Sequence, residues 1–384
     1  MRKLLLALLV LPVALDAQQQ TPFELSVSNI MRGPEHVGRE PTDVRWTPDG
    51  RWIYFRWNEP GTDWREAPRP FRVRPTAGAR PERVTLMHMD SVGALLAAAA
   101  ETGSRAQRAV TYNGDLFLVD VRSNTARRLT RTREAETQPQ LDVTGSQVFF
   151  VRGSNAYAVQ LGTGEVRQIT NIRTDTVAEP RRPDPRRELL EAQQLELIEA
   201  IRDRARLDSI AEAERARRDS IYAGPLTLAR GESVASMSVS PSGRAVIIIT
   251  ESRAQRARQT EVPQYVTRTG YAEVLRVRDK VGDEQPFRRV GVMRLPSGET
   301  TWLMVTPDDT TRPTRSVNVL GWNERGTGVL VTVRSADNKT RWVHVVDEAG
   351  VITTVDVQRD TAWVGNKSYD NTAATGTAGW FAGG

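Results

Sequence analysis

The chain has 384 residues, of which 39% are apolar and 26% are charged, and this composition excludes a disordered chain. The formal net charge is +6, and the basic residues are almost all arginines with acidic neighbours along the sequence. A nucleic-acid-binding protein usually gathers its basic residues on one face, so we expect no nucleic-acid partner. The absence of cysteine excludes disulfides, thiolate metal sites and a cysteine nucleophile.

The first 17 residues have the pattern of a secretory signal peptide. Basic Arg2 and Lys3 precede an apolar run from Leu4 to Leu15, and Ala17 is a small residue at a suitable cleavage position. The apolar run is too short to span a bilayer, and no second apolar run supports the alternative of a membrane anchor. The sequence therefore predicts an exported protein, periplasmic or secreted, with no stable membrane insertion after residues 1–17 are removed.

A pattern of ten or eleven residues then recurs along the chain. Its clearest copy is WTPDGRWIYF (46–55), in which an apolar residue leads into a Pro-Asp-Gly turn and an aromatic run follows. Looser copies are LDVTGSQVFF (141–150), VSPSGRAVII (239–248) and GWNERGTGVLV (321–331). Each copy predicts a β-hairpin, because alternating runs flank a turn that contains glycine.

A second pattern completes the repeated unit. Its two clear copies are GDLFLVDVRSNTARRLT (114–130) and SNAYAVQLGTGEVRQIT (154–170), which place Asp115 and Asn155 40 residues apart. Two hairpins make a four-stranded antiparallel sheet, and a period of about 40 residues with four strands is typical of a β-propeller blade. A β-sandwich with coincidental turns is the alternative, but the repeated order of the two hairpins favours the propeller.

We therefore predict an all-β fold, namely an incomplete β-propeller of about five four-stranded antiparallel blades with one α-helical insertion. The propeller domain spans residues 40–384, with blades near residues 40–85, 92–130, 135–170, 232–303 and 316–357. The first hairpin of the second blade is degenerate and rich in alanine. The fourth blade is lengthened by an insertion from about Glu251 to Tyr271.

The helical insertion is expected at about residues 184–222, where the turn residues give way to Glu, Arg, Ala and Leu. Asp184 can cap the helix and Pro185 can occupy its first turn. Leu190, Leu197, Ile198 and Ile201 form one narrow apolar stripe at helical spacing. Residues 181–219 carry ten basic and ten acidic residues, so the segment lacks the charge excess of a membrane-binding helix. We expect it to lie on the propeller surface or to reach toward a partner domain.

The residues needed for catalysis do not form a complete set. A serine hydrolase of the α/β type needs a G-x-S-x-G elbow, and the nearest stretch, GESVA (231–235), has the wrong fifth residue. The three histidines, His36, His88 and His344, do not follow a candidate nucleophile in the order of a catalytic triad. His344 lies in an alternating strand and is interpreted as a packed side chain. We assign no catalytic, cofactor-binding or metal-binding residue.

Two further groups of residues have structural interpretations. The acidic pairs Asp308-Asp309 and Asp283-Glu284 fall in polar, turn-like stretches and are interpreted as solvated loops. The tryptophans Trp46, Trp322 and Trp380 occupy the same place before a turn, so we expect them in the core between blades rather than in a ligand site.

With the blades placed, several stretches resemble a known family. The runs GDLFLVDVRSNTARRLT and NAYAVQLGTGEVRQIT, the segment from Thr260 to Leu303, and LGWNERGTGVLVTVRSADNKTRWVHVVDEAGVITTV resemble the propeller of dipeptidyl peptidase IV-like serine peptidases, in the prolyl oligopeptidase family. The resemblance covers residues 42–380 apart from the helical insertion. TolB-type propellers share the single blade motifs, so the ordered combination carries the resemblance.

The resemblance implies a division of labour. In that family an α/β-hydrolase domain with Ser, Asp and His follows the propeller, which gates access for peptide substrates. One branch of the family also grips the substrate amine with a Glu-Glu pair, and this sequence has no matching motif. Glu191, Glu196 and Glu199 lie in the helical insertion, but their spacing does not equate them with that pair.

The last residues repeat the start of a blade. LGWNERG (320–326) opens one blade, and AGWFAGG (378–384) begins in the same way. We therefore expect a fragment of a longer peptidase, with peptides as partners through a catalytic domain outside these residues. The alternative is a stand-alone TolB-type protein-binding module. A peptidase activity within these residues is the third and least favoured hypothesis, and the sequence assigns no oligomeric state.

Overall fold

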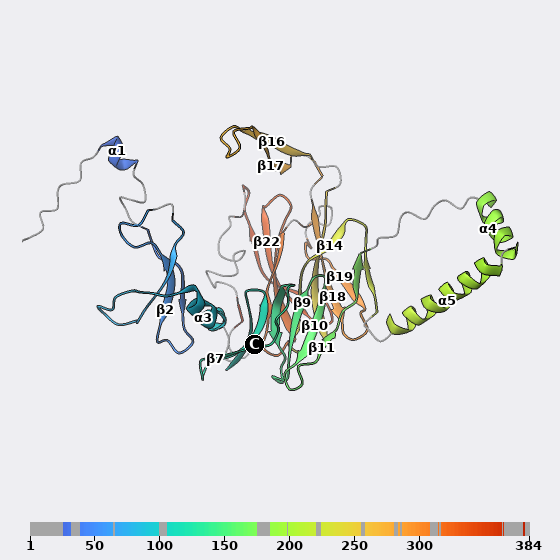
Figure 1. Cartoon of the computed structure of the whole chain (residues 1–384), viewed down its shortest axis with the longest axis horizontal. Coiled ribbons are helices and arrows are strands. Elements are labelled where there is room, and N and C mark those ends of the chain that lie inside the picture. The colour runs from blue at the N-terminus through green and yellow to red at the C-terminus, as the bar shows by residue number, and fades with distance from the viewer. Residues whose placement is uncertain are drawn as a thin grey trace, which may run out of the picture.

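The computed structural model is built mainly from antiparallel β-sheets (Figure 1). It describes residues 26–31, 39–63, 66–99, 106–174, 185–197, 199–219, 224–254, 258–279, 283–284, 286–307, 314, 316–362, 364 and 379–380. The predicted signal peptide, residues 1–17, lies outside these residues. The described chain begins with a single helical turn, α1 (Val27–Ile30), which Ser26 caps.

Five sheets follow one another along the chain, and in each of them neighbouring strands are also neighbours in sequence order apart from one inserted hairpin. The first sheet contains β1 (Thr42–Trp46), β2 (Ile53–Trp57), β3 (Arg69–Val73) and β4 (Glu82–Arg83). The second contains β5 (Gln107–Tyr112), β6 (Asp115–Asp120) and β7 (Thr125–Arg128). The third contains β8 (Glu136–Leu141), β9 (Gln147–Arg152), β10 (Asn155–Gln160) and β11 (Val166–Gln168). The fourth contains β14 (Glu232–Val239), β15 (Ala245–Ser252), β18 (Phe287–Arg294) and β19 (Thr300–Leu303). The fifth contains β20 (Ser316–Trp322), β21 (Gly328–Arg334), β22 (Thr340–Asp347) and β23 (Ile352–Arg359).

The repeated Trp-Thr-Pro-Asp-Gly-type pattern forms the turn between the first two strands of four of these sheets. A polar residue opens each turn and is buried in every copy: Thr47, Asp142, Ser240 and Asn323. The glycine three positions later has a positive φ in every copy, at Gly50, Gly145, Gly243 and Gly326. The amide of that glycine donates to the carbonyl oxygen of the opening residue at 2.8–3.2 Å. Only glycine adopts this backbone conformation without a steric cost, which explains why the pattern recurs.

The sheets are stacked face to face. Apolar side chains at successive positions of a strand pack on opposite faces of its sheet. In β15, Ile247 and Ile249 pack against the fifth sheet, whereas Val246 and Ile248 pack against the third sheet. In β9, Phe150 packs against the second sheet and Phe149 against the fourth. Successive side chains of a strand point to opposite faces, so each central sheet is buried on both sides by its neighbours in the chain. The all-β, propeller-like fold predicted from the sequence is confirmed.

The second sheet differs from the prediction, because a helix stands in place of its first strand. Helix α3 (Leu86–Ala99) lies between the first and second sheets (Figure 1). Leu96 packs against Tyr54 of the first sheet, while Leu95 and Ala98 belong to a cluster with Val110 of the second sheet. Alanine and leucine favour helix, and this segment has apolar residues all round, so it is stable as a buried helix between two sheets. The second blade therefore has three strands rather than four.

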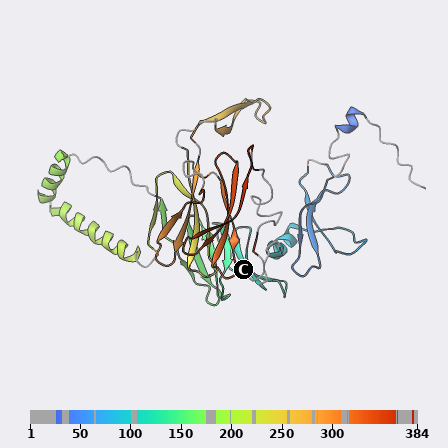
Figure 2. The ribbon, with the colours of Figure 1, turned by 180° about the vertical axis from the view of Figure 1, so that it is seen from behind.

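The predicted helical insertion contains two helices, α4 (Pro185–Leu197) and α5 (Glu199–Asp219). In two opposite views of the molecule, both helices lie apart from the sheets (Figures 1 and 2). Asp184, the predicted capping residue, and Ile198 lie outside the described residues. On each side of the insertion a short strand, β12 (Ile172–Thr174) or β13 (Leu226–Leu228), pairs with the other in parallel.

The insertion in the fourth sheet is longer than predicted. It extends from the end of β15 at Ser252 to the start of β18 at Phe287, and it contains an antiparallel hairpin of β16 (Gln259–Gln264) and β17 (Glu273–Asp279). The predicted end at Tyr271 falls in the tip of this hairpin. The hairpin lies beyond the end of the fourth sheet (Figure 1).

Of the three tryptophans predicted to lie between blades, Trp322 and Trp380 pack against a sheet and Trp46 does not. Trp322 is 8% exposed and packs in the core between the fourth and fifth sheets. Trp380 lies against the fifth sheet, where its indole Nε1 donates to the carbonyl oxygen of Gly321 at 2.9 Å. For Trp46 the prediction was wrong, because this side chain is 49% exposed. It belongs to the first sheet, whose outer face has no neighbouring sheet within the described chain.

Candidate functional site

The chain connections divide the stacked sheets into two ends. In an antiparallel four-stranded sheet, the turns between the first two and the last two strands lie at one end, which we call the turn end. The connections between the second and third strands, and from sheet to sheet, lie at the opposite end, which we call the insertion end. The turn end carries short turns at 142–146, 240–244 and 323–327. The insertion end carries the long connections 169–231, 253–286 and 304–315, so variation concentrates there.

A buried carboxylate marks the start of β8 at the insertion end. Glu136 is 1% exposed, and its Oε1 accepts hydrogen bonds from Arg152 Nη2 at 2.7 Å and from Thr132 Oγ1 at 2.6 Å. Thr130 Oγ1 donates to the other oxygen, Oε2, at 2.8 Å. The backbone amide of Glu136 donates to the carbonyl oxygen of Gly114 in the preceding sheet at 2.8 Å. These contacts join the second sheet to the first strand of the third.

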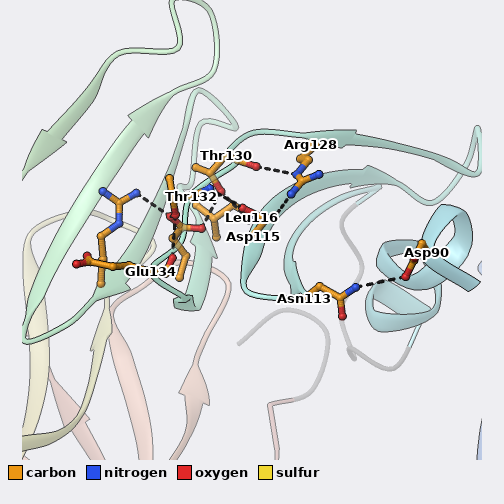
Figure 3. Close-up of polar contacts among 10 residues, drawn as sticks. Asp90, Asn113, Asp115, Leu116, Arg128, Thr130, Thr132 and Glu134 are labelled. Carbon is orange, nitrogen blue, oxygen red and sulfur yellow. Dashed lines mark hydrogen bonds and ion pairs between the residues drawn. The ribbon is translucent and has the colours of Figure 1, made fainter. Parts of the chain in front are cut away.

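The same region contains a polar latch at the end of the second sheet (Figure 3). The amide of Leu116 donates to Thr130 Oγ1 at 2.9 Å, and the amide of Thr132 donates to Asp115 Oδ1 at 3.0 Å. Arg128 forms an ion pair with Asp115 and also donates from Nε to the carbonyl oxygen of Thr130 at 2.9 Å. The latch fixes the chain as it leaves β7 and turns toward the next sheet.

The third sheet repeats this latch 40 residues later. The amide of Ala156 donates to Thr170 Oγ1 at 2.8 Å, and the amide of Ile172 donates to Asn155 Oδ1 at 2.7 Å. Gln168 Nε2 donates to the carbonyl oxygen of Thr170 at 2.6 Å, as Arg128 does in the second sheet. The 40-residue spacing found in the sequence therefore reflects a repeated structural contact, because buried backbone groups need hydrogen-bond partners.

A second buried carboxylate begins β14 in the fourth sheet. Arg289 holds Glu232 from two nitrogens: Nε lies 2.9 Å from Oε1, and Nη2 lies 2.6 Å from Oε1 and 2.7 Å from Oε2. Thr250 Oγ1 also donates to Glu232 Oε1 at 2.5 Å. Burial alone would raise the pKa of Glu232, but the hydrogen bonds from Thr250 and Arg289 and the charge of Arg289 outweigh burial and lower it. The guanidinium of Arg289 lies 4.0 Å from the ring centre of Trp302, which adds a cation–π contact.

The position of this ion pair links both insertions. Glu232 follows the segment that contains α4 and α5, whereas Thr250 precedes and Arg289 follows the segment that contains β16 and β17. Arg288 extends the contact by pairing with Glu251 at 2.8 Å. Because Arg and Thr donors occupy the oxygens of Glu136 and Glu232, both carboxylates are suited to holding strands in place rather than to exchanging protons with a ligand.

The histidines take structural places where the chain is described. His344 is fully buried, and its Nε2 must donate to the carbonyl oxygen of Val305 at 2.9 Å, which leaves Nδ1 to accept from Thr354 Oγ1 at 3.1 Å. Burial lowers the pKa of His344, and the bond to Val305 opposes this only in part. His88 lies in α3, and its Nε2 is 2.8 Å from the hydroxyl oxygen of Tyr54. His36 lies outside the described residues.

GESVA, the acidic pairs and the glutamates of the helical insertion do not come together in one site. In GESVA, Gly231 precedes β14, and Glu232 and the serine lie in that strand. Asp283 accepts a hydrogen bond from the backbone amide of Arg258 at 3.1 Å, as a loop residue does, whereas Asp308-Asp309 lie outside the described residues. Glu191 is exposed on α4. Within the described ranges, no group of three or more His, Asp or Glu side chains could hold a metal ion.

Sequence reasoning missed Glu136 and Glu232. Their arginine partners come from other strands, 16 and 57 residues away along the chain, so no local motif contains the pair. The usable signal was the threonine that ends both clear copies of the second pattern, Thr130 and Thr170, because each is the hydroxyl of a latch. In the described part of the chain, no helix is both long enough and apolar enough to cross a membrane.

Comparison with known proteins supports part of the resemblance. Residues 96–179 match the family model for the dipeptidyl peptidase IV (DPP IV) N-terminal region. This range runs from the last turns of α3 through the second and third sheets, including both latches, so the resemblance is confirmed over these residues. The comparison with curated proteins gave no match.

Solved structures with a similar arrangement include two peptidases and a TolB protein. Dipeptidyl peptidase 4 from Porphyromonas gingivalis is 12% identical, with a TM-score of 0.41, and the match covers 88% of this chain and 43% of that chain. A putative dipeptidyl aminopeptidase IV from Bacteroides ovatus is 12% identical, with a TM-score of 0.36, and the match covers 85% and 38%. TolB from Acinetobacter baumannii is 10% identical, with a TM-score of 0.30, and the match covers 84% and 55%. This chain thus spans less than half of either peptidase.

Proposed function

We propose that this chain is the non-catalytic β-propeller portion of an exported serine peptidase, and that it gates and selects the peptides that reach a catalytic α/β-hydrolase domain. The observation that carries the proposal is the family match over residues 96–179, which covers the two sheets that share the 40-residue latch. The activity, the peptide substrate and the export of the whole protein belong to this proposal.

The insertion end supports a gating role. The long connections of the sheets lie at this end. The buried ion pair of Glu232 and Arg289 joins the strands that follow two of these connections. Fixed strands with variable connections at one end are the usual way in which a β-scaffold presents a selective surface. Peptide hydrolysis by a serine mechanism also needs an activated serine, a histidine base and oxyanion donors. The proposal assigns these groups to the hydrolase domain.

Labelling with a fluorophosphonate probe tests the proposal. The purified 384-residue chain is compared with the natural gene product, read from its own start codon to its own stop codon. We expect no labelling of the 384-residue chain, and stoichiometric labelling of a longer product at a serine in a G-x-S-x-G elbow. Changing that serine to alanine is the control and should abolish labelling.

Two results would contradict the proposal. One is stoichiometric labelling of the 384-residue chain at a serine whose change to alanine removes the label, which would reveal an active site within these residues. The other is a natural product that ends soon after Gly384 and takes no label, which would favour a stand-alone binding module of the TolB type.

A further inference from the structure

The hairpin of β16 and β17 is a two-stranded sheet that lies apart from the five stacked sheets. Among the described strands, β16 and β17 pair only with each other, and both views place the hairpin beyond the end of the fourth sheet (Figures 1 and 2). No described side chain from position 258 to position 277 is buried. A two-stranded hairpin is only marginally stable in water, and a third strand is one of the elements that stabilise it. The hairpin is therefore suited to receiving a further strand.

Both faces of the hairpin carry exposed apolar side chains. Leu275 is 49% exposed and shares a face with its cross-strand partner Val262, which is 45% exposed. Val274 points to the opposite face and is 59% exposed. The connection between the strands adds Tyr265 and Tyr271, which are 76% and 79% exposed. Apolar side chains grouped in this way on an exposed element are typical of an interaction surface.

The two edges of the hairpin differ in what they offer to another strand. β16 contains Pro263, which has no N–H, and proline is one of the residues that protect an edge strand from further pairing. β17 contains no proline, and its positions 273–276 pair with β16 in regular register. The register irregularity of this hairpin lies beyond position 276. The outer edge of β17 at positions 273–276 is thus the edge that can accept a further strand.

Arg276 gives this edge its charge. Its Nε lies 3.5 Å from Oε1 of Glu261, but the two side chains are 71% and 59% exposed, so this ion pair contributes little. A guanidinium has five N–H donors and can bind a second carboxylate. A strand added to β17 would therefore complement it with an acidic residue directly opposite Arg276 and with apolar residues opposite Val274 and Leu275.

A second copy of β17 does not provide this pattern. Residues that lie opposite each other in an antiparallel pair share a face, and a two-fold axis keeps the faces of the two copies the same. Glu273 and Arg276 are three positions apart in the regular part of the strand, so they point to opposite faces. A symmetric pair of β17 strands therefore cannot place Glu273 opposite Arg276, whereas a strand of different sequence can place an acidic residue there.

We propose that the outer edge of β17, at positions 273–276, binds an extended peptide as the third strand of the hairpin. The peptide contains an acidic residue between apolar residues and has no proline. In this mode of binding, main-chain hydrogen bonds supply affinity and the side chains at alternate positions supply specificity. The choice of a peptide as occupant rests on the proposed function, since the hairpin belongs to the insertion end, where gating is proposed.

Fluorescence anisotropy with the 384-residue chain tests the proposal. The probe is fluorescein-labelled Thr-Val-Glu-Val-Val-Thr, and the matched peptide has Lys in place of Glu. We expect the Glu peptide to bind about fivefold more tightly or better, because opposite charges attract across a strand pair and like charges repel. Arg276→Glu should reverse this preference. Arg268→Glu makes the same charge change at an exposed position between the two strands and should leave the preference unchanged.

Hydrogen exchange locates the bound peptide. We expect the Glu peptide to slow exchange of backbone amides at positions 273–276, with less change along β16. Equal affinity for the two peptides, an unreversed preference in Arg276→Glu, or slowed exchange only in another part of the chain would overturn the proposal. So would protection of β17 that grows with protein concentration in the absence of peptide, since a second copy would then be the occupant. Peptide binding requires no catalytic serine, so failure of this site and failure of the peptidase proposal give different results.

Discussion

The turn end of this molecule is built from one repeated turn, whereas the insertion end is built from connections of different lengths. At the turn end, four copies of one pattern place a buried polar residue and a positive-φ glycine at the same positions, and neighbouring turns contact each other. The amide of Val143 donates to the carbonyl oxygen of Pro241 at 2.9 Å, and Ser240 Oγ donates to that of Gly326 at 2.6 Å. At the insertion end, the connections differ from sheet to sheet.

The two ends are therefore stabilised by different kinds of contact. The turn end depends on backbone conformation, which leaves a visible repeat in the sequence. The insertion end depends on side-chain pairs such as Glu232 with Arg289, which join strands far apart in the chain. Substitutions at the two ends should therefore lower the free energy of unfolding by different amounts and for different reasons. The expected effects are given from the largest to the smallest.

The largest effect is expected for Gly326→Ala at the turn end. Gly326 has a φ of +75°, and a Cβ there would lie 2.5 Å from Ser242 N and 2.6 Å from Ser240 Oγ in the neighbouring turn. The backbone strain and the clash together should lower the free energy of unfolding by about 3 kcal/mol. Gly50→Ala is the matched control, because Gly50 has a φ of +67° but nothing within 4 Å of the added Cβ.

The control should lose only the strain component, about 1 kcal/mol. Denaturant unfolding followed by tryptophan fluorescence measures both variants. Equal losses would show that the contacts between turns contribute nothing to the stack.

Next in size is Glu232→Gln at the insertion end. The change removes the charge that Arg289 and Thr250 satisfy, and it should lower the free energy of unfolding by about 2 kcal/mol at neutral pH. Glu299→Gln is the control, because Glu299 pairs with Arg294 at an exposed site, and its loss should stay within about 0.5 kcal/mol. The pair is measured by thermal and denaturant unfolding.

The pH dependence gives the same prediction a second readout. The pKa of Glu232 is lower in the folded protein than in the unfolded chain, where a glutamate has a pKa of about 4.3. Its stabilising contribution is therefore complete above that value and is lost as the pH falls toward the folded pKa. Glu232→Gln should flatten this part of the acid unfolding curve, and an unchanged curve would show that the ion pair does not stabilise the fold.

The repeat at the turn end could be predicted from the sequence, because each turn is encoded by adjacent residues. The helix α3 could not be predicted from the repeat, since the repeat calls for a strand there. The alanine-rich segment becomes a helix, and Gly93 lies so close to the Tyr112 ring that a Cβ would be 2.0 Å from it. The helix thus occupies a space shaped by a residue of β5 that the local sequence does not reveal.

Two further features depend on the arrangement of whole sheets. Trp46 has the same local motif as Trp322, but its burial depends on whether another sheet is present, so sequence position alone gave the wrong answer. Glu136 and Glu232 are polar residues at strand starts. The pairing of β8 with β9 brings Arg152 to Glu136, and the pairing of both β14 and β18 with β15 brings Arg289 to Glu232. Long-range pairing of this kind is set by tertiary packing rather than by local propensity.

A smaller effect is expected at His344, which anchors the connection after β19 through the carbonyl oxygen of Val305. Burial lowers the pKa of His344, so the folded protein takes up a proton there at a lower pH than the unfolded chain, in which a histidine has a pKa of about 6.5. The unfolded state therefore binds the proton first as the pH falls. Stability is complete above about pH 6.5 and decreases below it.

Between pH 7.5 and 5.5 this group should lower the free energy of unfolding by up to about 1 kcal/mol. His344→Gln cannot titrate and should lose that part of the pH dependence, although it is less stable at every pH. Urea unfolding at the two pH values measures the difference. A variant with the same loss between the two pH values as the natural sequence would show that another group is responsible.

The smallest effect is expected for removal of α4 and α5. The apolar side chains described on them are exposed, for example Leu207 at 65%, and both helices stand away from the sheets (Figure 2). Replacing residues 185–219 with a short Gly-Ser linker leaves β12 and β13 free to pair, and a flexible loop adds little closure cost. The melting temperature should therefore change by no more than about 2 °C, because the described side chains of α4 and α5 belong to no core cluster. Pro185→Gly in the intact chain is the control for the entry to α4. A fall of more than about 5 °C after the deletion would show that the helices pack on the sheets, and that the insertion end is held by more than the ion pair at its feet.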